Sequence, residues 1–377
     1  MPAVPRTAAR RLAAQAKNHP LLHFTPNWFA MTMGTGIVAI VLGQFPQAPL
    51  LHEAGAMLWL FNIGLFGLCT FAYLAKWVLY PRAARALFSH PVASMFLGCI
   101  PMGLATIVNG LLSYGMVLFG PGAVSLAVYV WIVDALLSVV IGLAVPFMMF
   151  TRQDHVIQEM SAVWLLPVVA CEVAAVSACL LMPHVADAGT QLCLLVAGMV
   201  LWACSVPLAL GILVILFLRL VLHKLPPSGM AATSWLALGP IGTGALALAL
   251  MAGEAEAVLA ANGLSAYGNG LAAGSLLGAI LLWGYGLWWM AMAIALTLRY
   301  LHKGMPFNMS WWGFTFPLGV YTVATLKLAA LLGLAPLARF GEGLTVALVL
   351  IWMLVIVRTL RGAFSLTLFE DPSLKLA

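Results

Sequence analysis

Ten long runs of apolar residues, separated by short polar stretches, dominate the pattern along the chain. Most are 20 residues or longer, about the length of α-helix that crosses the hydrocarbon core of a bilayer. Proline, glycine or charged residues mark most of the junctions between them. The pattern predicts an all-α integral membrane protein with ten transmembrane helices, over residues 26–45, 55–80, 91–117, 122–150, 160–182, 190–222, 232–252, 267–300, 310–333 and 340–362.

Composition argues against a soluble protein. Of the 377 residues, 64% are hydrophobic and only 7% are charged, whereas a soluble domain carries about 25% charged residues. The six cysteines form no CxxC pair, and the histidines show no HExxH or clustered pattern. We therefore expect no metal and no cofactor. The sequence also lacks the GxxxxGK[ST] motif, so we do not expect this chain to drive transport with ATP.

The basic residues fall almost entirely on one side of the predicted membrane. Lysine and arginine are retained on the cytoplasmic side of short loops. With ten helices, 15 of the 17 basic residues share the side of both chain ends, Arg339 lies opposite, and Lys327 stays within the ninth helix. This distribution predicts an inner-membrane protein with both termini in the cytoplasm. It divides the chain into a basic cytoplasmic tail (1–23), a transport domain (24–364) and a cytoplasmic C-terminal tail (365–377).

The odd-numbered segments share an aromatic residue followed by a proline or glycine. Proline removes a backbone hydrogen bond, and in a membrane the freed carbonyl must be satisfied by protein or water. Five such breaks at similar depth indicate five helices around one hydrated axis, with the even-numbered helices outside. The alternative is that prolines are simply frequent in membrane helices, since even-numbered segments hold Pro146 and Pro207. The motif occurs as Phe29-x4-Gly34-Thr35-Gly36, Phe96-x4-Pro101-x-Gly103, Trp164-x2-Pro167, Trp235-x4-Pro240-x-Gly242 and Trp312-x4-Pro317-x-Gly319.

Four stretches that carry these motifs, at 24–36, 90–103, 162–167 and 311–319, resemble the tellurite-resistance/dicarboxylate transporter family. That family includes slow-type anion channels, malic-acid permeases and sulfite efflux pumps, and the resemblance covers about residues 24–362. It implies five helical hairpins around a quasi-fivefold central pore, assembled as a homotrimer with one pore per subunit. It also implies that Phe316 occludes the pore as a hydrophobic constriction. An ordinary packed phenylalanine is the alternative.

Three ionisable residues lie inside the predicted helices, where a charge is costly and so points to a function. Lys327 is expected to attract an anion into the pore, or else to snorkel or pair with a buried carboxylate. Glu172 is expected to be protonated, to pair with Lys327, or to couple a proton to transport. For Asp134, on an even-numbered helix, a structural hydrogen-bonding role is favoured over transport.

The polar residues left to solvate an anion inside the helices are sparse. Hydroxyl groups and the amides of broken helices solvate anions without binding them tightly. For each threonine the alternative is a hydrogen bond back to its own helix. The residues are Thr32, Thr35, Thr106, Asn109, Thr243, Thr315, Thr322 and Thr325.

Transport of small anions, by a secondary carrier or a channel, is the predicted function. The resemblance makes C4-dicarboxylates such as malate the first substrate, with sulfite, tellurite-related oxyanions and chloride as alternatives. A membrane-embedded enzyme is a distant alternative, because the sequence offers no catalytic cluster at one depth, and we expect no catalytic residue. The expected partners are the small anion, the lipid bilayer and further copies of the chain in the homotrimer; no nucleic acid is expected.

Overall fold

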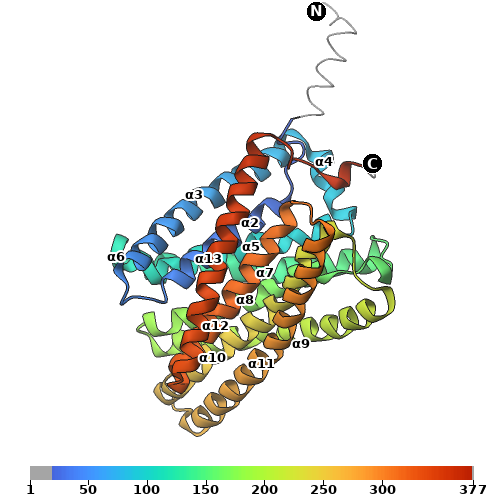
Figure 1. Ribbon diagram of the computed structural model, residues 1–377. Helices are drawn as coiled ribbons and strands as arrows, with labels where there is room; N and C mark the ends of the chain where they lie inside the picture. The colour runs from blue at the N-terminus through green and yellow to red at the C-terminus, as the bar shows by residue number, and fades with distance from the viewer. Residues whose placement is uncertain (1–18, 376–377) are drawn as a thin grey trace, which may run out of the picture.

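The computed structural model describes residues 19–375, and within that range the chain is built from helices, with no β-strand (Figure 1). Nine of these helical segments are long and apolar enough to cross a membrane, and a shorter tenth runs over Pro26–Leu42. The prediction of an all-α integral membrane protein is therefore confirmed. Most of the basic N-terminal tail, including Arg6, Arg10, Arg11 and Lys17, lies outside the described residues.

The spans pair as five consecutive helical hairpins. The first member of each pair is α2 (Phe29–Leu42), α5 (Cys99–Gly110), α8 (Leu166–Leu181), α10 (Leu238–Ala261) or α12 (Thr315–Leu332). The second member is α3 (Pro49–Leu79), α7 (Gly122–Thr151), α9 (Ala188–His223), α11 (Ser265–Lys303) or α13 (Ala335–Phe364). The third span continues beyond α5 through a π-helical turn, Leu111–Gly115, into the short α6 (Met116–Phe119).

Burial separates the two members of each hairpin into an inner and an outer ring. All 14 residues of α2 are buried, and the apolar windows of the spans containing α5, α8, α10 and α12 are 72–94% buried. The windows of the five outer helices are only 17–33% buried. Exposed leucines, valines and phenylalanines on the outer helices suit lipid as the surrounding solvent.

The inner helices close into a ring of five. Along the chain α2 contacts α5, α5 contacts α8, α8 contacts α10, and α10 contacts α12. The last inner helix, α12, then returns to contact α2, and α13 also contacts α2. This closed order is the arrangement expected for a quasi-fivefold bundle.

One tryptophan on each outer helix donates its indole N–H to the inner helix of the next hairpin. Each bond satisfies an indole donor and joins two neighbouring hairpins. One such bond therefore links every adjacent pair of hairpins around the ring. The five bonds run from Trp59 to the Ile107 carbonyl (3.3 Å), Trp131 to the Ala174 carbonyl (2.9 Å), Trp202 to the Gly244 carbonyl (3.2 Å), Trp283 to Thr325 Oγ1 (2.9 Å) and Trp352 to Thr35 Oγ1 (3.2 Å).

Each inner span begins as a 3-10 helix and becomes an α-helix within the sequence motif or directly after its aromatic residue. The 3-10 segments are Pro26–Trp28, Ala93–Gly98, Ala162–Leu165, Ser228–Ala237 and Met309–Phe314. Pro101, Pro167, Pro240 and Pro317 all fall within the first three residues of the α-helix that follows. A proline in the first helical turn removes no α-helical hydrogen bond. Each of these α-helices directly continues a 3-10 helix, so freed carbonyls in the 3-10 segments stay a prediction.

Several predicted helix boundaries were wrong, because prolines and glutamates expected between the spans lie inside helices. Pro49 and Pro336 fall between the predicted spans, but each stands in the first turn of an outer helix. Glu254 and Glu256 also fall between predicted spans, yet α10 continues through them to Ala261. Acidic residues near a helix end reach the membrane surface, so they do not stop the helix there.

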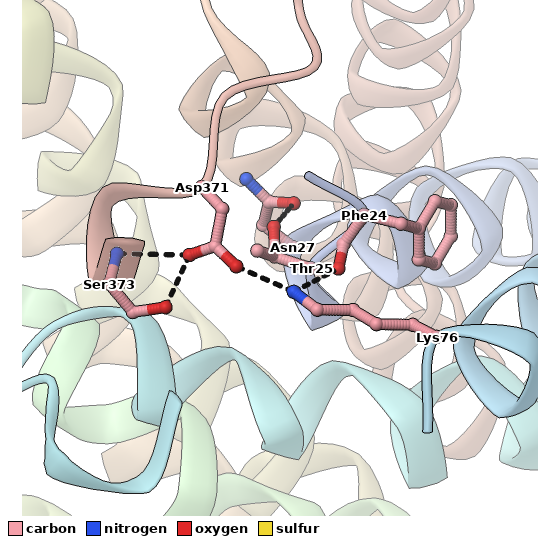
Figure 2. Close-up of polar contacts among 6 residues, drawn as sticks. All are labelled: Phe24, Thr25, Asn27, Lys76, Asp371 and Ser373. Atoms are coloured by element: carbon pink, nitrogen blue, oxygen red, sulfur yellow. Dashed lines mark hydrogen bonds and ion pairs between the residues drawn. The ribbon is translucent and has the colours of Figure 1, made fainter. Parts of the chain in front are cut away.

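The C-terminal segment beyond α13 is held by a buried ion pair, drawn in Figure 2. Lys76 Nζ lies 2.5 Å from Asp371 Oδ2 and also donates to the Phe24 carbonyl at 2.9 Å. The other carboxylate oxygen accepts from the backbone N–H of Ser373. Both charged side chains are at most 2% exposed. The pair therefore ties the C-terminal segment to α3 and to the entry of the first span.

A cytoplasmic location of both termini and assembly as a homotrimer stay predictions.

Candidate functional site

An enclosed cavity of about 130 Å³ lies between the inner helices and takes side chains from all five spans. On each helix the lining residues are spaced three or four apart, as expected for a single face. They are Ile37, Ile40 and Gln44 in the first span; Thr106, Asn109 and Ser113 in the third; Val173, Val176 and Leu180 in the fifth; Thr243, Leu246 and Leu250 in the seventh; and Phe316, Val320, Val323 and Lys327 in the ninth.

Phe316 and Lys327 mark the two ends of the cavity along α12. Phe316 stands in the first turn of α12 and is 2% exposed. Lys327 lies eleven residues later, a rise of about 16 Å along the helix axis. The bulky aromatic ring is thus the lining residue of α12 nearest the 3-10 segment, whereas the ammonium group stands near the opposite end.

Lys327 is the one charged residue among the residues that line the cavity. It is partly exposed, and no carboxylate of residues 19–375 lies within ion-pair distance of its Nζ atom. The expected alternative, a pair between Lys327 and Glu172, is therefore not formed. An unpaired ammonium in a mostly apolar cavity favours a negatively charged occupant.

Most hydroxyl and amide donors in the cavity are already used by the backbone. Thr106 donates to the Gly103 carbonyl, Thr243 to the Gly239 carbonyl, and Ser113 to the Asn109 carbonyl. In each case the hydroxyl donates to a carbonyl of its own helix, which is the alternative expected for the threonines. Gln44 likewise donates to its own helix. Lys327 Nζ and Asn109 Nδ2 donate no hydrogen bond within residues 19–375, so both can donate to a bound anion; the buried Asn109 Oδ1 is an acceptor without a partner.

None of the predicted helix-break residues is among the residues that line this cavity in the described chain. The glycines instead permit close packing between neighbouring inner helices. A Cβ atom at Gly36 would lie 2.0 Å from Thr106 Oγ1, and one at Gly103 would lie 2.4 Å from Thr32 Oγ1. The same holds for Gly34 against Thr315, Gly242 against Tyr321, and Gly319 against Ile37. Thr35 faces the outer helix α13, where it accepts from Trp352.

Glu172 and Asp134 are completely buried but do not reach the cavity. Glu172 lies on α8 beside Ser205 of α9, and Asp134 lies on the outer helix α7. No hydrogen bond satisfies either carboxyl group within residues 19–375. Neither side chain can contact an anion in the cavity, so the roles expected for Glu172 toward the substrate would have to act through other residues.

Two polar lining residues, Gln44 and Ser113, were absent from the sequence-based set. A signal for both existed, because each continues the three-and-four spacing of the lining residues before it, Ile40 and Asn109. Gln44 was placed at the end of the first run, and Ser113 falls inside the π-helical turn, which often marks a functional site.

Comparisons with known proteins agree with this architecture. The family model for the voltage-dependent anion channel matches residues 23–360. The chain is 34% identical over 352 residues to a sulfite efflux pump of Arthroderma otae, covering 92% of this chain and 93% of that protein. It is 31% identical over 351 residues to an uncharacterized transporter of Methanocaldococcus jannaschii (93% and 97% covered). It is 24% identical over 354 residues to a malic acid transport protein of Schizosaccharomyces pombe (91% and 79% covered).

Proposed function

Since the chain belongs to the voltage-dependent anion channel family, we propose that it carries small oxyanions of the sulfite type through the cavity between its inner helices. The observation that carries this proposal is the cavity itself. All five inner helices line it, its single charged lining residue is the unpaired Lys327, and the buried Phe316 stands at the end opposite Lys327 along α12. This arrangement suits an anion pathway with a hydrophobic constriction.

Charge matching favours sulfite over the dicarboxylate that the family resemblance put first. The cavity offers one ammonium group and one free amide, so a singly charged anion such as hydrogen sulfite finds one opposite charge. A malate dianion would leave its second carboxylate without a cation in a low-dielectric site, which is costly. The relatives support the same order, because the sulfite efflux pump shares more identity with this chain than the malic acid transport protein does.

Phe316 is proposed to be the constriction that limits flux. Its ring is buried at the end of the cavity, where an apolar side chain resists wetting. Phe314, two residues earlier, packs against the rings of Trp235 and Trp311 instead and is not a lining residue. The two phenylalanines therefore form a matched pair for testing the gate.

The test is anion flux into liposomes that contain the purified protein, with sulfite, malate and chloride each measured with and without a pH gradient. We expect sulfite to move faster than malate. We also expect Phe316→Ala to raise sulfite flux several-fold and Phe314→Ala to leave it unchanged. Each substitution removes the same buried ring, at a similar stability cost of about 3–5 kcal/mol. Equal flux in the two variants would remove the gate assignment, and absence of flux for all three anions would overturn the proposed function.

A further inference from the structure

Two adjoining hollows lie between the outer helices α9 and α11, on the side of the bundle that holds most of the basic residues. The first is a narrow slot of about 30 Å³. Its walls are mainly aliphatic, from Leu216 and Leu220 on α9 and from Met292 and Leu296 on α11. The rest of the slot is lined by the segments that precede α8 and α10, including Met160, Ala231 and Ser234.

The second hollow is a wider, basic pocket of about 430 Å³. Lys224, Arg299 and Lys303 line it, and all three side chains are exposed. It shares Pro226 and Tyr300 with the apolar slot, so the two form one continuous site. The site thus changes from aliphatic between the helices to cationic at their ends.

A fourth positive charge is buried where the two hollows meet. Arg219 is 4% exposed, and its guanidinium donates to the backbone carbonyls of Gln158 and Lys224. Within residues 19–375 the one ion pair is Lys76–Asp371, so none of the four cationic groups at this site is paired with a carboxylate. A buried charge compensated only by carbonyl dipoles is costly unless an anion comes close.

We propose that this site binds an anionic phospholipid. Its phosphate lies in the basic pocket near Lys224, Arg299 and Lys303, and one acyl chain lies between α9 and α11 over the mouth of the slot, which is too small to enclose it. Each half of the site matches one part of the lipid. Cations at the membrane surface attract acidic headgroups, and aliphatic walls suit a hydrocarbon chain. This inference stands apart from the transported substrate, because the site shares no lining residue with the central cavity.

The slot also touches a 3-10 segment that contacts the one before Phe316. Ser234, in the 3-10 helix Ser228–Ala237, lines the slot, and the next residue is Trp235. The ring of Trp235 packs edge-on against Phe314 at 5.7 Å between centroids, two residues before Phe316. Its indole donates to Thr297 of α11 at 2.9 Å. A lipid between α9 and α11 would therefore lie beside the 3-10 segment that packs against Phe314.

Binding is tested with the purified full-length chain in detergent, titrated with phosphatidylglycerol or phosphatidylcholine and followed by native mass spectrometry. We expect the anionic lipid to bind at least tenfold more tightly than the zwitterionic one. The double variant Arg299→Gln, Lys303→Gln should weaken phosphatidylglycerol binding about 30-fold, given the usual contribution of a basic residue at a membrane surface. Both side chains are exposed, so the variant keeps the fold.

The matched control is Arg82→Gln, Arg85→Gln, which removes two exposed charges from the short helix α4 (Pro81–Ala86). It should leave lipid binding unchanged; an equal loss in this control would mean general attraction to the basic surface and would overturn the site. Glycerophosphoglycerol and inorganic phosphate, added without acyl chains, should not displace the lipid at equal concentration. Displacement by either would show that the apolar slot contributes nothing and would overturn the assignment to a phospholipid.

Discussion

Replacing Lys327 by methionine tests whether the unpaired ammonium draws anions into the cavity. Methionine is also long and unbranched, so Lys327→Met removes the charge with little change in shape. Because Lys327 is partly exposed and forms no ion pair in the described part of the chain, the variant leaves no buried partner uncompensated. Loss of folded protein is therefore expected to be small, and the effect should appear in transport.

The magnitude follows from the distance of closest approach. A charged oxygen in contact with the ammonium lies about 4 Å away, where attraction is about 1 kcal/mol in water and about 4 kcal/mol at an effective dielectric constant of 20. A partly exposed lysine in a cavity lies between these limits, so we take about 2 kcal/mol. At 1.4 kcal/mol per factor of ten, this corresponds to an apparent sulfite affinity about 30-fold weaker.

The assay is the concentration dependence of sulfite flux in liposomes at constant ionic strength. Lys327→Arg should keep most of the affinity, because the charge remains. Arg339→Met is the matched control: it removes an exposed positive charge from α13, near the same end of the bundle but outside the cavity lining. At 0.15 M salt the screening length is about 8 Å, so a distant surface charge matters little. If Lys327→Met and Arg339→Met gave the same curve as the unchanged protein, the attraction role would be refuted.

Two further predictions concern stability. Lys76→Met leaves Asp371 buried without its partner, which costs about 3–5 kcal/mol, so the C-terminal segment should become sensitive to limited proteolysis; unchanged resistance would contradict the clamp. Trp131→Phe removes the bond to the Ala174 carbonyl and should lower the free energy of unfolding in detergent by about 1 kcal/mol. Trp288→Phe changes an exposed ring and should leave the free energy of unfolding unchanged. Equal losses in the two variants would argue against a contribution from the inter-hairpin bond.

Part of the fold could be read from residues alone because lipid imposes a simple length rule. Runs of apolar residues gave the number of spans, and the basic residues fell in the short loops between them. The aromatic–proline motif assigned the odd-numbered segments to the inner ring. One signal was available and missed. Each outer helix has a tryptophan preceded by an aliphatic residue, as in Leu58-Trp59 and Ile351-Trp352, and these are the residues that join the hairpins.

The sequence by itself determined the class of protein, the inner and outer helices, and the residues Phe316 and Lys327 as candidates. Only the tertiary structure decided which face of each inner helix meets the cavity, and it placed Glu172 and Thr35 against outer helices instead. The physical reason is that an inner membrane helix is apolar on every side. Periodicity identifies a face only where one side is polar, so orientation had to come from packing around the ring.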